Sequence, residues 1–260
     1  MSTRVHHLNC GTFRPPGVGR FVAHVLLVER AQGLLLVDTG FGTGDLAQPR
    51  RLGAPFRAFM RPALDAAETA LAQVRALGHR PEDVTDIALT HLDLDHVGGI
   101  GDFPQARVHV HATELAAARS PKISERMRYV SAQWSHGPHW VEHRADGERW
   151  LGFEATQAVG DDVLLVPLHG HSRGHTGVAV PRPGGGWLLH AGDAYFDAGD
   201  TATPPAGSRR LAVVQRALAA DDAARRANTE RLRELRRDHG DEVTVFCAHS
   251  AAEYDALAGA

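Results

Sequence analysis

Four side chains of the types that bind metal ions lie within six consecutive residues of the sequence. They are His91, Asp93, Asp95 and His96 of the run HLDLDH, which comes just after the apolar segment Ile87-Ala88-Leu89 and ends at two glycines. In an extended chain, residues i and i+2 point to the same side, so His91 and Asp93 would face one site. As the chain turns toward the glycines, Asp95 and His96 would face an adjacent site. Two neighbouring metal ions, each bound by part of this run, are the arrangement expected for hydrolytic chemistry.

Three further polar clusters follow apolar segments in the second half of the chain. They are Gly170-His171-Ser172-Arg173-Gly174-His175, Gly192-Asp193 and Ala248-His249. Side chains at the same ends of neighbouring strands converge in space. We therefore expect these clusters to join the HLDLDH run in one site.

The elements that must position these clusters can be predicted from the spacing of apolar residues. Segments rich in Val and Leu predict strands at residues 21–29, 33–38, 86–90, 107–110, 164–168, 177–180, 187–190 and 243–247. Helical spacing of Ala and Leu predicts helices at 63–77, 113–118, 209–239 with a break near 221–222, and 251–258. Segment 120–162, which is rich in Trp, His, Gly and Pro, is predicted as an ordered functional loop region. No linker divides the chain, which predicts one domain over residues 1–260.

With these motifs in order, the chain resembles the metallo-β-lactamase superfamily of dinuclear metal hydrolases. The resemblance covers residues 21–249 and rests on the order of Val37-Asp38-Thr39-Gly40, HLDLDH, GHSRGH, Gly192-Asp193 and the final His249. It implies an α/β fold, a four-layer αβ/βα sandwich with its metals at one edge between two sheets.

The resemblance also implies a role for each candidate residue. His91, Asp93 and His171 would bind one metal, Asp95, His96 and His249 would bind the other, and Asp193 would bridge both. His175 and Asp38 would support these ligands from behind. The family usually has HxHxDH, whereas Asp93 stands here in place of the second His. The additional carboxylate makes the ligand set more anionic, so zinc is expected first and iron or manganese stay open.

Two divalent ions lower the pKa of a bridging water, and the resulting hydroxide would attack a substrate carbonyl. Asp95 would orient this hydroxide and pass a proton to the leaving group. Trp134, His136, Trp140 and Phe196 could line a substrate pocket, or the Trp and His residues of segment 134–140 could instead pack a lobe of the fold. A lactone is the first expectation for the substrate, and a thioester is the second.

Two other protein classes remain as alternatives. Residues 170–174 also satisfy the GxSxG motif of α/β-hydrolases, and Asp193 and His249 follow Ser172 in the order of that triad. That class requires a helix directly after the serine, but residues 177–180 and Pro181 predict a strand that ends at a proline. A structural zinc site would have four ligands, usually including cysteine, whereas the candidate ligands offer only nitrogen and oxygen.

Composition limits the partners and the location. The formal charge is −3 and no basic stripe is present, so no nucleic-acid partner is expected. Residues 1–20 lack the apolar core of a signal peptide, and no segment approaches the roughly 18 apolar residues of a transmembrane helix. We expect a cytoplasmic protein that is not bound to membranes and acts on a small molecule. His109 and His111 alternate on a predicted strand without a neighbouring acidic residue and are expected to face solvent.

Overall fold

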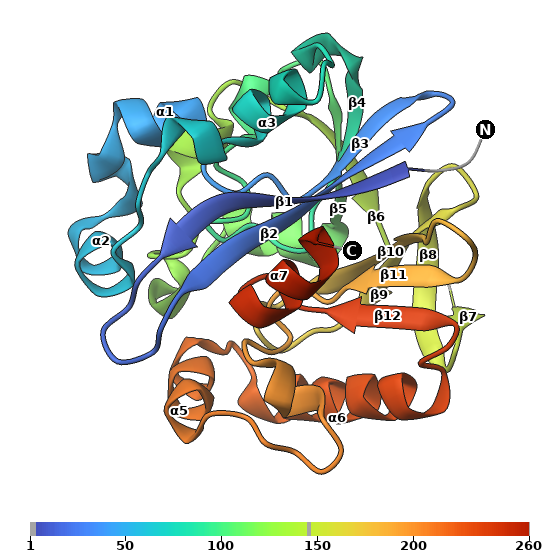
Figure 1. Ribbon diagram of the computed structural model, residues 1–260. Helices are drawn as coiled ribbons and strands as arrows, with labels where there is room; N and C mark the ends of the chain where they lie inside the picture. The colour runs from blue at the N-terminus through green and yellow to red at the C-terminus, as the bar shows by residue number, and fades with distance from the viewer. Residues whose placement is uncertain (1–3, 145–146, 260) are drawn as a thin grey trace.

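The computed structural model describes residues 4–144 and 147–259, which form two facing β-sheets with helices on their outer sides (Figure 1). The first sheet has the strand order β1-β2-β3-β4-β5-β6. Strands β1, β2 and β3 pair antiparallel, and β3 to β6 pair parallel. The strands are β1 (Arg4–Phe13), β2 (Phe21–Arg30), β3 (Gly33–Val37), β4 (Val84–Ala88), β5 (Arg107–His111) and β6 (His139–His143).

The second sheet has the strand order β12-β11-β10-β9-β8-β7. Only β11 and β12 pair parallel, and the remaining neighbours pair antiparallel. The strands are β7 (Glu148–Trp150), β8 (Phe153–Val159), β9 (Val163–Pro167), β10 (Thr176–Pro181), β11 (Trp187–His190) and β12 (Val243–Phe246).

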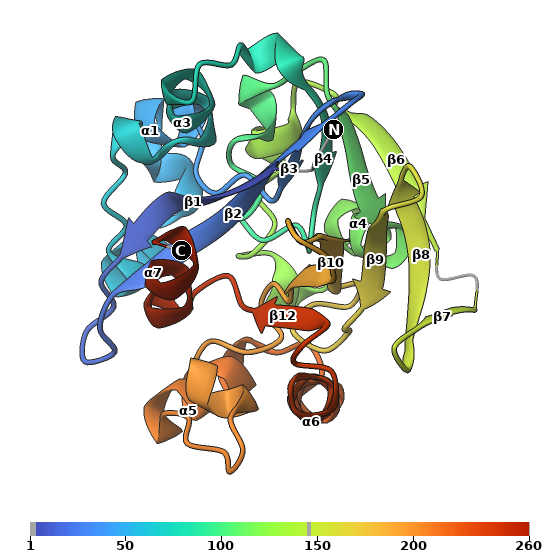
Figure 2. The ribbon, with the colours of Figure 1, turned by 45° about the vertical axis from the view of Figure 1, so that its right-hand side comes forward.

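Figure 2 shows α3 and α6 on opposite outer sides of the two sheets. None of the helices in the described part of the chain is long and apolar enough to cross a membrane. The α-helices are α1 (Thr43–Ala47), α2 (Ala54–Met60), α3 (Ala70–Ala76), α4 (Ala112–Arg119), α5 (Arg209–Leu218), α6 (Asp222–Asp238) and α7 (Ala251–Ala258). Short 3-10 helices cover Pro49–Leu52, Ala66–Glu68, Pro81–Asp83, Ile100–Asp102, Ile123–Glu125, Ser131–Trp134 and Ala198–Thr201.

Strand β2 shows why its sequence is apolar at nearly every position. Successive side chains of a strand point to opposite faces. Leu26 and Val28 pack against the second sheet, in a cluster that includes Leu165 and Val178. Val25 and Leu27 face the helical layer on the other side. A strand covered on both faces needs apolar residues on both, and the predicted four-layer sandwich is confirmed.

Some elements differ from the predictions. Strand β1 was not predicted, because His6, His7 and Asn9 interrupt its apolar pattern. The predicted loop region 120–162 contains β6, β7 and the whole of β8 besides irregular segments. The predicted helix 63–77 is shortened to α3, because the Thr69 side chain accepts a hydrogen bond from the Ala72 amide and caps the helix there.

The prediction that His109 and His111 face solvent is wrong. Both are buried, because β5 lies inside the first sheet between β4 and β6. His109 has the acidic partner that the local sequence does not show: its Nε2 lies 2.9 Å from Asp86 Oδ1 on β4. The Asp86 carboxylate also binds Arg30 Nη2 at 2.7 Å. A buried carboxylate of the neighbouring strand therefore accounts for a buried histidine.

Candidate metal centre

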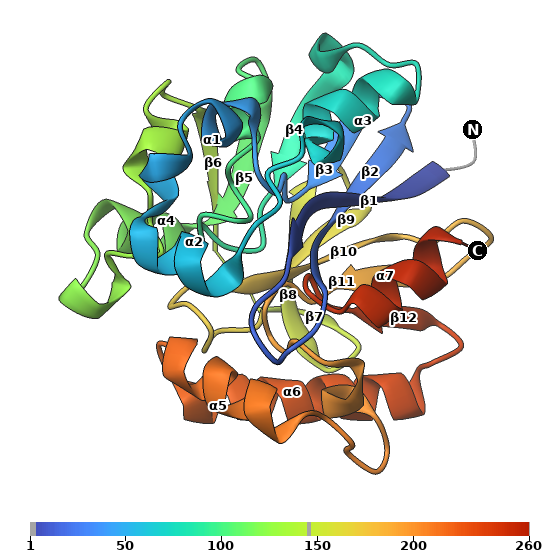
Figure 3. The same cartoon turned by 60° about the vertical axis from the view of Figure 1, so that its left-hand side comes forward.

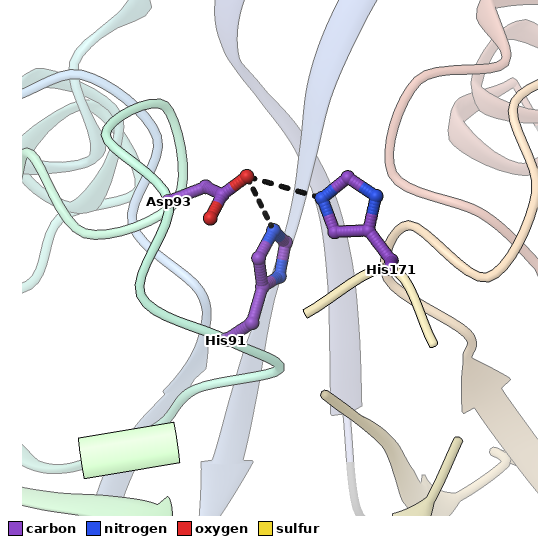
Figure 4. A group of neighbouring side chains, drawn as sticks. All are labelled: His91, Asp93 and His171. Atoms are coloured by element: carbon purple, nitrogen blue, oxygen red, sulfur yellow. Dashed lines mark hydrogen bonds and ion pairs between the residues drawn. The ribbon is translucent and has the colours of Figure 1, made fainter. Parts of the chain in front are cut away.

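The seven candidate metal ligands lie on four loops at one edge of the sandwich. The loop after β4 carries His91, Asp93, Asp95 and His96, and the turn between β9 and β10 carries His171. Asp193 follows β11, and His249 follows β12. All of them except Asp93 are buried. Figure 4 shows His91 and Asp93 of one loop and His171 of another pointing toward one another.

Asp193 joins two groups of ligand atoms. Its Oδ2 lies 3.8 Å from His91 Nε2 and 3.4 Å from His171 Nε2. Its Oδ1 lies 3.3 Å from His96 Nε2 and 3.2 Å from His249 Nε2. One carboxylate oxygen therefore faces each group, which is the geometry of a bridging ligand.

The remaining carboxylates complete one group each. Asp93 Oδ2 lies 3.0 Å from His171 Nε2 and 3.6 Å from His91 Nε2. Asp95 Oδ2 lies 3.7 Å from His249 Nε2. The structure thus brings together all seven predicted ligands in the two predicted groups, and their ligand atoms lie within 4.8 Å of one another in each cluster. These His and Asp clusters are consistent with a dinuclear metal site.

Three of the histidines are held so that Nε2 points at this centre. His91 Nδ1 lies 2.9 Å from Thr90 Oγ1, His96 Nδ1 lies 2.8 Å from Asp38 Oδ2, and His249 Nδ1 lies 2.8 Å from the Val22 carbonyl. When Nδ1–H donates to these oxygens, the Nε2 lone pair is free. His91 Nε2, His96 Nε2 and Asp193 Oδ1 are buried without a hydrogen-bond partner among the described residues. Bound cations would satisfy these buried lone pairs, which face the two ligand groups on either side of Asp193. The residues therefore fit two metal ions.

Asp38 and His175 stand behind the ligands, as expected for supporting residues. The Asp38 carboxylate accepts hydrogen bonds from the Thr90 amide at 2.8 Å and the Thr90 hydroxyl at 2.7 Å, in addition to His96. Its backbone φ is +58°, a strained value for a residue with a side chain. His175 Nε2 accepts a hydrogen bond from the Asp193 amide at 2.9 Å and so fixes the bridging residue.

Two carboxylates of the centre, Asp193 and Asp93, are held in their ionised form. Without a metal, burial raises the pKa of Asp193, but the positive charges that His249, His96 and His171 carry when protonated more than offset this effect and hold the pKa well below its usual range. Burial likewise raises the pKa of Asp93, and Arg128 and His91 more than offset it. Anionic side chains in a buried pocket with few water contacts attract divalent cations.

Glu114 is a functional candidate that the sequence analysis missed. This fully buried carboxylate accepts hydrogen bonds from the Leu92 amide at 3.0 Å and the Gly174 amide at 2.9 Å. It also accepts one from the Ser172 hydroxyl at 2.7 Å. Glu114 therefore ties the loop with His91 and Asp93 to the turn with His171. Because its partners on these two loops lie 22 to 60 residues away, no local sequence pattern indicates this role.

The same contact bears on the serine-hydrolase alternative. The Ser172 hydroxyl donates to Glu114, and within the described residues no hydrogen bond joins it to a histidine. The chain after it enters β10 without an intervening helix. A catalytic serine needs a base within hydrogen-bond reach, so Ser172 has the surroundings of a structural residue.

Arg128 is the second residue that the sequence analysis missed. Its Nη1 lies 3.3 Å from Asp93 Oδ1 and donates to the His171 carbonyl at 3.1 Å. Its Nη2 donates to the Leu218 carbonyl at the end of α5 at 2.5 Å. The guanidinium thus places a fixed positive charge beside the carboxylate that distinguishes the HLDLDH run.

A cavity of about 480 Å³ opens beside the ligands. Its walls are mainly apolar and come from the turn before β2, from α2, from segment 124–130 and from α5. Asp93, Asp95, His171, Asp193 and His249 face its inner end. An apolar cavity with a few polar groups at one end suits a small molecule that has an apolar part and one reactive polar group.

The predicted pocket residues divide into two groups. Phe196 lines this cavity, and so do Phe56, Phe59 and Met60. Trp134, His136 and Trp140 are not among the residues that line it, so the first of the two alternatives given for them does not apply to this cavity. Trp134 and Trp140 instead pack against the hydrophobic cluster on the helical side of the first sheet, where their large apolar surfaces cover that core.

Comparison with known proteins agrees with this geometry. A probable metallo-hydrolase of Mycobacterium tuberculosis is 46% identical over 259 residues, which cover 96% of this chain and 81% of that protein. The N-acyl homoserine lactonase AttM of Azorhizobium caulinodans is 30% identical over 172 residues, 65% of this chain and 64% of that protein.

The fold also matches solved structures. An N-acyl homoserine lactone hydrolase with the product N-hexanoyl-L-homoserine at its catalytic metal centre superposes with a TM-score of 0.75, covers 98% of this chain and 97% of its own, and is 18% identical. The sequence profile described as Metallo-beta-lactamase superfamily matches residues 18–249. This chain therefore belongs to the metallo-β-lactamase superfamily.

Proposed function

We propose that this chain, a metal-dependent hydrolase of the metallo-β-lactamase superfamily, opens the ring of a lactone that carries an apolar acyl group. One observation carries the proposal: the Asp193-bridged ligand groups lie at the inner end of a largely apolar cavity. The lactonase relatives and the solved lactone hydrolase support the choice of substrate.

Seven side chains would hold the metals in this proposal. His91, Asp93 and His171 would bind one ion, Asp95, His96 and His249 the other, and Asp193 both. Two such ions polarise a substrate carbonyl and lower the pKa of water enough to supply a nucleophile near neutral pH. The nitrogen and carboxylate donors suit zinc, and the number of carboxylates also suits iron or manganese.

The chain's own residues orient the substrate and move the proton. The apolar walls, including Phe56, Phe196 and Leu211, exclude water from the acyl group and direct the ring toward Asp193. Asp95 lines the cavity, and its carboxylate would accept a proton from the attacking water. The same carboxyl can return that proton to the alkoxide that leaves when the ring opens.

A thioester is the second candidate substrate, because the same carbonyl chemistry applies and a thiolate leaves more easily than an alkoxide. The decisive experiment compares the metal-loaded protein on acyl-homoserine lactones of several chain lengths and on matched acyl thioesters. Protein stripped with a chelator and the Asp193→Asn variant serve as inactive controls. Lactone opening that increases with acyl length is expected, and thioester turnover without lactone opening would reverse the order of the two candidates.

A further inference from the structure

Exposed apolar side chains gather on segments that line the apolar cavity. Among the described residues, six large hydrophobic side chains are exposed, and five of them lie in three segments that contribute to the cavity wall; Phe59, Met127 and Leu218 line the cavity themselves. These segments are α2, residues 121–130 and α5, which Figure 3 shows on the same side of the molecule. The five are Ile123 (83% exposed), Met127 (73%), Val213 (69%), Phe59 (49%) and Leu218 (46%), which together we call the mouth patch.

The exposed charges of the same three segments are all positive. Glu125, their one acidic residue, is buried, and its carboxylate binds Arg173 at 2.9 Å. The exposed charged side chains are Lys122, Arg126, Arg209, Arg210 and Arg216. The chain as a whole carries a net charge of −3, so this one-sided distribution is not a consequence of composition.

We propose that the mouth patch docks on an anionic lipid bilayer. Exposed apolar side chains insert among lipid chains, and surrounding Lys and Arg side chains bind anionic head groups. Phe59, Met127 and Leu218 belong to both the mouth patch and the cavity lining, so an amphiphilic substrate would enter the cavity from the bilayer without crossing water. The sequence analysis expects no membrane association because the chain has no spanning segment, but peripheral binding needs none.

A second copy of this chain fits the mouth patch less well than a bilayer does. Two copies that meet through this surface would bring two sets of cationic side chains together, and like charges oppose such contact. Anionic head groups complement the same charges. The inference does not depend on the proposed lactone chemistry, because its test measures binding alone.

The test is co-sedimentation of the full, metal-loaded chain with lipid vesicles. One set contains phosphatidylcholine only, and the other contains about one third phosphatidylglycerol, which supplies the negative surface charge. We expect binding to the anionic vesicles that weakens as salt is raised. Ile123→Glu and Val213→Glu should each weaken it by about tenfold or more, because neither side chain can then enter the lipid.

Leu77→Glu is the matched control. Leu77 is 40% exposed but follows α3, far from α5 in Figure 1, so this change should leave lipid binding intact. Metal content and thermal unfolding are measured for each variant, so that loss of the fold is not mistaken for loss of binding. Equal binding to both kinds of vesicle, or equal weakening by Leu77→Glu, would overturn the proposal. Self-association of the wild type that Ile123→Glu abolishes would also overturn it and would assign the mouth patch to a second copy.

Discussion

Arg128 Nη1 lies 3.3 Å from Asp93 Oδ1, and the same nitrogen donates to the backbone carbonyl of His171 at 3.1 Å. One guanidinium therefore connects a candidate ligand of the loop after β4 with the backbone of a candidate ligand between β9 and β10. Both partners of the ion pair are largely buried, at 12% and 13% exposed. Arg128 supplies the positive charge that makes a carboxylate tolerable at position 93 when no metal is bound.

Replacing Arg128 by Met should destabilise the metal-free protein more than the metal-loaded protein. Without Arg128, Asp93 is a largely buried charge with no fixed cation, whereas a bound metal would still neutralise it. We expect the free energy of unfolding of the chelated protein to fall by roughly 2 kcal/mol. This loss lies between the loss typical of breaking an exposed ion pair and that typical of breaking a buried one. Denaturant unfolding with and without chelator measures this difference.

An Asp93→His background should remove that penalty, because a neutral imidazole needs no counter-charge. Arg128→Met should then be neutral or stabilising, so the two changes should be strongly non-additive. Arg119→Met, which breaks an exposed ion pair with Glu142, is the matched control and should have little effect. Additive effects of Arg128→Met and Asp93→His would show that the ion pair contributes nothing.

Replacing Glu114 by Gln should loosen both ligand-bearing loops. The carboxylate accepts hydrogen bonds from two backbone amides and two hydroxyls. The NH2 group of Gln is itself a donor, so it could not accept the hydrogen bonds that one carboxylate oxygen of Glu114 accepts. We expect a loss of roughly 3 kcal/mol in the free energy of unfolding, together with reduced metal content. Glu142→Gln on the exposed surface is the control. Unchanged stability and metal content in Glu114→Gln would refute the positioning role.

Replacing Ser172 by Ala should leave substantial activity. The change removes one hydrogen bond to Glu114 and should cost about 1 kcal/mol of stability. His171→Ala should instead abolish turnover and lower the metal content measured by elemental analysis. An inactive Ser172→Ala variant with its full metal content would return the serine mechanism to consideration.

Asp86 should contribute stability that disappears in acid. Burial raises its pKa, but hydrogen bonds from His109 and Thr85 and the charge of Arg107 lower it further, to about 2 from an ordinary 3.8. Because the folded pKa lies below the unfolded value, the contribution is fully present above about pH 4 and is lost as the pH falls through about 2. It amounts to about 2 kcal/mol.

The chelated wild type and Asp86→Asn are compared by unfolding between about pH 2 and pH 7. The variant should be less stable at neutral pH, and the difference should shrink in acid. Asp238→Asn, at an exposed ion pair with Arg237, is the control. A difference that stays constant with pH would mean that the ionisation of Asp86 is not the cause.

Much of the fold could be predicted from local sequence. Strand β2 and strand β10 are covered on both faces, so they are largely apolar and their sequences alone indicate buried strands. Strand β1 has one partly exposed face with histidines, and its pattern is too weak to identify. The predicted helix began too early, at residue 63, because Ala-rich sequence favours helix, whereas the Thr69 side chain caps the N-terminus of α3 and fixes where the helix begins.

Part of the candidate ligand set was indicated by short-range spacing. In HLDLDH four ligand types lie within six residues on the turn that follows a strand, whereas the roles of His171, Asp193 and His249 were implied by the family resemblance. Glu114, Arg128 and the cavity walls were not predictable, because their contacts join residues that are 15 to 60 or more positions apart and share no local pattern. Trp134 and Trp140 show the same limit. Their apolar side chains were evident in the sequence, but only the tertiary structure shows that they pack against the hydrophobic cluster of the first sheet, in which β6 is the edge strand. The spacing of residues in the sequence determines which metal-ligating side chains share a loop. Only the packing of the two sheets against each other determines which charged residues from distant parts of the chain contact those side chains.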